Sequence, residues 1–115
     1  MITIIKKLLR ATQFSLQGLR AAYKSELAFR LECWLSLVLI PMALLFGKTP
    51  VEKTLLIAVW VLVPMVELIN SAIETVVNRI GAEQHPLSGQ AKDMGAAAVL
   101  LALTLALCTW ILIFI

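Results

Sequence analysis

The fold is decided by residues 50–80, which read PVEKTLLIAVWVLVPMVELINSAIETVVNRI. Thr49 and Glu52 form the Thr-x-x-Glu pattern of a capping box, proline follows at the first helical position, and Gly81 supplies a stop. A helix of this length would be about 46 Å long, against a hydrocarbon core of about 30 Å. We therefore expect a membrane-spanning helix that extends beyond the bilayer at one end and is kinked at Pro64.

The composition of the whole chain is typical of membrane proteins. Of its 115 residues, 61% are hydrophobic and 15% are charged, and the mean hydropathy is +0.94. Disordered chains are far less apolar than this, and soluble domains carry more charge. We expect an all-α membrane protein with a single domain over residues 1–115, whose other transmembrane helices are residues 31–47 and 86–115.

Residues 1–30 differ from these spans because aliphatic side chains fall on one helical face and bases lie largely opposite. This pattern predicts an amphipathic helix in the membrane interface. The segment holds six bases, and Arg79 and Lys92 join them on the same side if there are three spans, which makes eight against two in the 48–53 turn. Because bases favour the cytoplasmic side, we expect a cytoplasmic N-terminus, an external C-terminus and a cytoplasmic extension of the second span.

Three polar residues interrupt the apolar second span. Glu67, Asn70 and Glu74 are spaced by three and four residues, so they share one helical face. A carboxylate that faces lipid costs several kcal/mol, so these groups must face protein or a wet cleft. Polar contacts between helices are the simpler explanation, above all for Asn70, but two acids and an amide on one face favour a functional site.

The second and third spans form a hairpin around residue 83. Residues whose numbers sum to about 166 should therefore lie level with each other. This register places Lys92 and Asp93 beside Glu74, and Ala96 beside Asn70.

Glu26 is a candidate partner for these acids. Mg²⁺ binds one or two carboxylates together with phosphate oxygens, so Glu26 and Glu74 would suffice to hold it. A local ion pair between Glu26 and Arg30 is the alternative. The chain lacks glycine-rich phosphate loops and a Ser-His-Asp arrangement. Its bases are not interleaved with stacking aromatics, so we expect no nucleic-acid partner.

Several motifs resemble those of the prokaryotic diacylglycerol kinase family, over nearly the whole chain. They are Gly18-Leu19-Arg20-Ala21-Ala22, Glu26 with Ala28-Phe29-Arg30, Glu67-Leu68-Ile69-Asn70-Ser71-Ala72-Ile73-Glu74, His85-Pro86-Leu87-Ser88-Gly89, and Ala91-Lys92-Asp93-Met94-Gly95-Ala96-Ala97. The resemblance implies a homotrimeric kinase of the bacterial inner membrane, with a surface helix and three transmembrane helices per subunit. It implies transfer of the γ-phosphate of ATP, with Mg²⁺, to diacylglycerol, which gives phosphatidic acid.

The resemblance also implies roles for single residues. Glu67 would be the general base, Glu26 and Glu74 the metal ligands, and Asn70 and Lys92 would support catalysis. The residues implied at the nucleotide are Lys7, Phe14, Glu26, Glu74, Glu83, Gln84, His85, Lys92 and Asp93. The residues implied at the lipid are Arg20, Tyr23, Arg30, Glu32, Glu67, Ala96 and Trp110.

Four positions depart from the family pattern. Phe14 stands where an aromatic hydroxyl is common, Asn78 where an acid is common, and Ala96 where serine is frequent, while Pro64 is not a family feature. None of them replaces a residue implied in the chemistry, so we expect the reaction to be retained and the nucleotide and lipid contacts to differ.

Three other functions remain open from the sequence. A polyprenol such as undecaprenol could replace diacylglycerol as the acceptor, with the same chemistry. The buried acids could instead carry protons or cations across the membrane, or the chain could be a structural scaffold. One subunit cannot enclose the acids, so we expect a homo-oligomer with sites between subunits.

Overall fold

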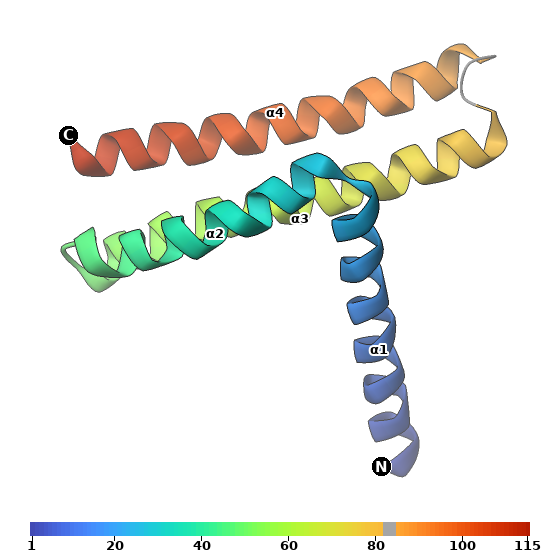
Figure 1. The fold of residues 1–115 in the computed structure, drawn as a ribbon, viewed down its shortest axis with the longest axis horizontal. Coiled ribbons are helices and arrows are strands. Elements are labelled where there is room, and N and C mark those ends of the chain that lie inside the picture. The colour runs from blue at the N-terminus through green and yellow to red at the C-terminus, as the bar shows by residue number, and fades with distance from the viewer. Residues whose placement is uncertain (82–84) are drawn as a thin grey trace.

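The computed structural model describes residues 1–81 and 85–115, which form four helices. They are α1 (Ile2–Ser25), α2 (Leu27–Phe46), α3 (Pro50–Ile80) and α4 (Pro86–Phe114). In Figure 1, α2, α3 and α4 run alongside one another, whereas α1 leaves this group crosswise. α4 packs along α3, α2 covers part of α3, and α1 contacts only α2 and α3 among the described residues.

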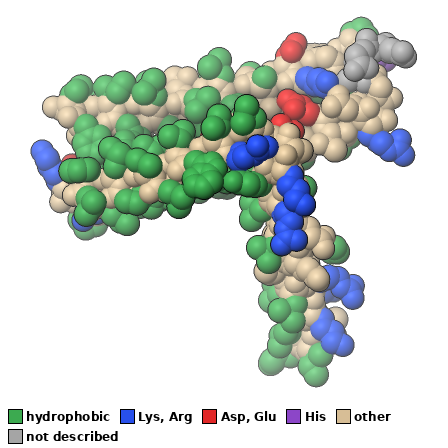
Figure 2. All heavy atoms as spheres, in the orientation of Figure 1, with side chains coloured by type: hydrophobic (Ala, Val, Ile, Leu, Met, Phe, Trp, Pro, Cys, Tyr) green, Lys and Arg blue, Asp and Glu red, His purple; other side chains and the backbone are tan. Residues whose placement is uncertain are grey.

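Three of the helices, α2, α3 and α4, are long and apolar enough to cross a membrane. The expected all-α fold, with three helices able to cross a membrane, is therefore confirmed. Most of their large apolar side chains are exposed in the single chain, and Figure 2 shows them covering the end of the molecule that lies away from the α3–α4 turn. Such a surface is suited to lipid or to another copy of the chain.

The first span begins earlier than the sequence analysis predicts. α2 starts at Leu27 instead of residue 31 and ends at Phe46 instead of residue 47, so it contains 20 residues and not 17. The surface segment is shorter in turn, because α1 ends at Ser25. Glu26 between them is extended, with φ −115° and ψ 109°, and the chain changes direction there without a glycine or proline.

The ends of α3 follow the expected signals, with one correction. The Thr49 hydroxyl accepts a hydrogen bond from the Glu52 N–H at 3.1 Å. The Glu52 carboxylate accepts from the Lys48 N–H at 3.0 Å, one residue before the partner that a capping box predicts. At the other end Gly81 is left-handed, with φ +113°, which a residue without Cβ adopts freely. The helix is unbroken through Pro64.

The predicted α3–α4 register is confirmed by a tryptophan. The Trp110 indole N–H donates to the Leu56 carbonyl at 3.1 Å, and these two numbers sum to 166. Nearby, Trp60 and Val63 of α3 pack with two small residues of α4, Ala102 and Ala106, in the buried core. The small side chains let α4 approach α3 closely.

Candidate functional site

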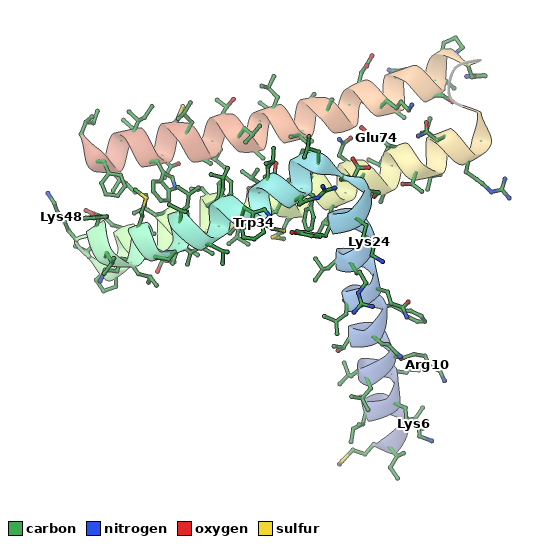
Figure 3. The ribbon with its side chains drawn as sticks, viewed as in Figure 1. Lys6, Arg10, Lys24, Trp34, Lys48 and Glu74 are labelled. Carbon is green, nitrogen blue, oxygen red and sulfur yellow. The ribbon has the colours of Figure 1, made fainter. Side chains whose placement is uncertain are left out.

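The polar face of α3 is buried against the rest of the chain. Glu67 and Asn70 are each 7% exposed, and Glu74, one turn beyond Asn70, is half-buried. In Figure 3, Glu74 lies on α3 at the level where α1 joins α2. The stripe therefore faces protein and not lipid, as expected from the cost of a lipid-facing carboxylate.

Asn70 connects Glu74 to α4. Its Nδ2 donates to Glu74 Oε1 at 3.3 Å, while its buried Oδ1 has no partner among the described residues. Gly95 of α4 lies directly against the Asn70 amide, so a Cβ at Gly95 would overlap with Oδ1. The register is thus one residue from the Asn70–Ala96 pairing that we predicted. Asn70 is held between Gly95 and Glu74, which restricts the Glu74 carboxylate.

Glu26 completes the acidic cluster from the junction of α1 and α2. It occupies the N-cap position of α2, but its side chain makes no capping hydrogen bond. Glu26 lines a cavity that is also lined by Ser71 and Thr75 of α3, the sequence neighbours of Asn70 and Glu74. The alternative of a simple Glu26–Arg30 pair is not what the structure favours, because the Arg30 guanidinium donates to backbone carbonyls instead.

Glu32 brings a further carboxylate from α2. It is 8% exposed, and its Oε1 has no hydrogen-bond partner among the described residues. Ser36, one turn below, donates to the Glu32 carbonyl at 2.7 Å and accepts from the Trp60 indole N–H at 2.8 Å. This Ser36–Trp60 contact fixes α2 against α3 just beneath the acids.

The cluster suits a hard cation in its donor chemistry. No group of three or more His, Cys, Asp or Glu that could hold a metal occurs within residues 1–81 and 85–115. A pair of carboxylates remains compatible with Mg²⁺ when phosphate oxygens supply other ligands. The Glu26 carboxylate, which makes no capping hydrogen bond, is an oxygen donor available to such an ion.

The residues expected at the nucleotide are only partly gathered. Lys92 is half-buried and Asp93 exposed near the start of α4. The His85 ring accepts from the Leu87 N–H at 3.1 Å and so caps α4, whereas Glu83 and Gln84 lie outside the described residues. Lys7 and Phe14 are exposed on α1, at about 28 and 18 Å along the helix from Glu26.

The residues expected at the lipid are spread over the molecule. Arg20, Tyr23 and Ala96 are exposed. Trp110 lies far from the acids, since its partner Leu56 is about 16 Å along α3 from Glu67. It lines an apolar cavity of about 370 Å³. The single chain thus does not bring Trp110 to the acidic cluster.

Two residues of the site were missed from the sequence. Gly95 could have been identified from the hairpin register, because its number and that of Asn70 sum to 165. Ser71 is 8% exposed with an unpartnered Oγ among the described residues. A lone serine beside Asn70 carries no sequence signal that separates it from ordinary helix packing.

Comparisons with known proteins cover nearly the whole chain. The family described as prokaryotic diacylglycerol kinase matches residues 13–114. A diacylglycerol kinase of Haemophilus influenzae is 49% identical over 108 residues, which cover 94% of this chain and 92% of that protein. Those of Pseudomonas aeruginosa and Escherichia coli K12 are 50% and 47% identical, over 94% and 90% of this chain and 88% and 85% of their own lengths.

Proposed function

This chain belongs to the prokaryotic diacylglycerol kinase family, and we propose that it transfers the γ-phosphate of ATP to the free hydroxyl of diacylglycerol. The products are phosphatidic acid and ADP. The observation that carries this proposal is the buried Glu67, which lies in a helix long and apolar enough to cross a membrane and shares one helical face with Asn70 and Glu74. A group of acids buried in a spanning helix costs free energy, and such acids are typical of functional sites.

Glu67 is the proposed general base. It takes the proton of the lipid hydroxyl as that oxygen attacks the γ-phosphorus and ADP departs. Glu67 lies seven residues from Glu74, or about 10 Å along the helix axis. This separation suits a base that reaches a hydroxyl on the lipid side and acids that meet the triphosphate on the water side.

Glu26 and Glu74 are the proposed Mg²⁺ ligands. The ion would neutralise charge on the phosphate oxygens. Asn70 holds the Glu74 carboxylate by its hydrogen bond, and Lys92 offsets the negative charge that develops on the transferred group. Around the rest of the nucleotide we propose Lys7, Phe14, Glu83, Gln84, His85 and Asp93.

α1 is the proposed surface helix. Figure 3 shows Lys6 and Arg10 extending from the same side of α1, and Figure 2 shows apolar side chains on the opposite side. This distribution supports an amphipathic helix in the cytoplasmic interface of a bacterial inner membrane. The N-terminus would then be cytoplasmic and the C-terminus external.

A homotrimer is the proposed assembly. Large apolar side chains remain exposed along all three spanning helices, which supports contacts with other copies. Sharing of a site between subunits is tested by mixing inactive Glu26→Gln and Glu67→Gln chains. Activity above that of either parent supports shared sites, whereas mixed oligomers without it oppose them.

The function itself is tested by transfer of labelled γ-phosphate to diacylglycerol in mixed micelles. We expect Glu67→Gln to lower kcat by about 100- to 10,000-fold, because it removes the base. Glu52→Gln is the matched control, since Glu52 lies at the opposite end of α3 and should leave kcat unchanged. Turnover retained in Glu67→Gln would overturn the assignment of the base.

Parallel assays separate the other functions. Faster transfer to undecaprenol than to diacylglycerol would make the chain a polyprenol kinase with the same chemistry. Cation flux in liposomes without ATP would indicate a transporter.

A further inference from the structure

One side chain holds the change of direction between α1 and α2. The Arg30 guanidinium donates from Nε to the Tyr23 carbonyl at 3.0 Å and from Nη2 to the Lys24 carbonyl at 3.1 Å. Its Cζ also lies 5.7 Å from the centroid of the Tyr23 ring. Both carbonyls belong to the last turn of α1, where the helix supplies no donors because it ends at Ser25. Arg30, in the first turn of α2, therefore caps α1 from outside it.

Glu26 is the only residue between the two helices. Its N–H donates to the Ala22 carbonyl at 2.8 Å, and its carbonyl accepts from the Arg30 N–H at 3.1 Å. The direction of the Glu26 side chain thus depends on how α1 and α2 meet. Since the guanidinium is occupied by carbonyls, it leaves the Glu26 carboxylate available to a cation.

Resting on the proposed function, we propose that Arg30 is a positioning residue, which clamps the α1–α2 junction and so holds the Glu26 carboxylate at the metal site. It does so in place of the lipid contact that the family resemblance implies. The planar guanidinium can bond two carbonyls and stack on a ring at once, whereas a lysine ammonium is a single point charge. Arg30→Lys should therefore loosen the junction although it keeps the charge.

The junction is measured without substrate or metal by pulsed electron spin resonance on the full chain in nanodiscs. Spin labels are placed at Gln13→Cys on α1 and at the exposed native Cys108 on α4, with Cys33→Ala, and labelled chains are diluted into unlabelled ones. We expect a narrow distance distribution that broadens in Arg30→Lys. Arg10→Lys, the same change on the exposed part of α1, should leave it narrow. An unchanged distribution in Arg30→Lys, or a broad one in the unmodified sequence, would overturn the proposal.

Kinetics distinguish positioning from lipid binding. In Arg30→Lys we expect the Mg²⁺ concentration for half-maximal activity to rise about 10- to 100-fold, as for other residues that orient a metal ligand, with the diacylglycerol KM within about twofold. Arg10→Lys should change neither value. A raised lipid KM with an intact junction would make Arg30 a lipid contact and overturn the proposal.

A second variant covers the case in which Arg30→Lys does not fold. Tyr23→Leu removes the ring but keeps both backbone carbonyls, so we expect a smaller broadening in the same direction. No broadening in Tyr23→Leu would then count against the clamp. If the unmodified protein phosphorylates no lipid, the proposed function fails. The distance measurement still tests whether Arg30 holds the α1–α2 junction.

Discussion

The two halves of α3 differ in whether their buried polar atoms have hydrogen-bond partners. In the tryptophan half, residues 50–63, Trp60 bonds to Ser36 and the Leu56 carbonyl accepts from Trp110. In the acid half, residues 66–80, Asn70 Oδ1 and Ser71 Oγ are buried without partners among the described residues. Buried polar atoms are normally satisfied. The contrast suits a tryptophan half that maintains the fold and an acid half that carries the proposed site.

Gly95→Ala should break this contrast most strongly. The added Cβ overlaps with the Asn70 amide, so Asn70 must move and Glu74 with it. We expect kcat to fall about 100-fold, as for ångström-scale misplacement of a catalytic group, in the radiolabel transfer assay. Stability should fall by about 1–3 kcal/mol. Gly89→Ala, at an α4 position with open space around it, is the matched control, and equal losses in both variants would refute this explanation.

Asn70→Ala should separate activity from stability. It removes the donor to Glu74, so we expect Mg²⁺ to bind about tenfold more weakly. This is measured as a higher Mg²⁺ concentration for half-maximal activity. Unfolding in mixed SDS micelles should change little, because the truncation also removes a buried acceptor that has no partner. Asn78→Ala on the exposed end of α3 should affect neither. A large loss of stability in Asn70→Ala would show that this residue serves packing.

Trp60→Phe should have the smallest effect on activity and should lower stability instead. It removes the donor to Ser36, so the unfolding free energy should fall by about 1 kcal/mol. Activity should remain close to that of the unmodified chain. Trp34→Phe, at an exposed tryptophan of α2, should leave both unchanged. A Trp60→Phe enzyme that is stable but inactive would contradict the division of α3 into two halves.

Much of this arrangement could be predicted from the sequence because it is periodic. The spacing of Glu67, Asn70 and Glu74 determines a shared helical face, and the hairpin arithmetic predicted the level at which Trp110 meets Leu56. The proline and glycine signals marked the ends of α3 because they act locally in the sequence.

The break at Glu26 could not be predicted in this way. Ser25 and Leu27 are compatible with a continuous helix, and only contacts across the junction stabilise the turn. Arg30 reads as one more interfacial base until its bonds to the end of α1 are seen. The closeness of Gly95 to Asn70 likewise depends on how two helices pack, which no single-helix pattern contains.

Pro64 lies at the boundary between the two halves of α3. Its ring nitrogen carries no hydrogen, so α3 lacks one backbone hydrogen bond there, the one that the Trp60 carbonyl would accept. A helix bends most easily where one of its backbone hydrogen bonds is missing. We therefore expect α3 to bend most easily between the segment that carries the acids and the segment that carries Trp60, so that the two can change their relative angle without either one unfolding.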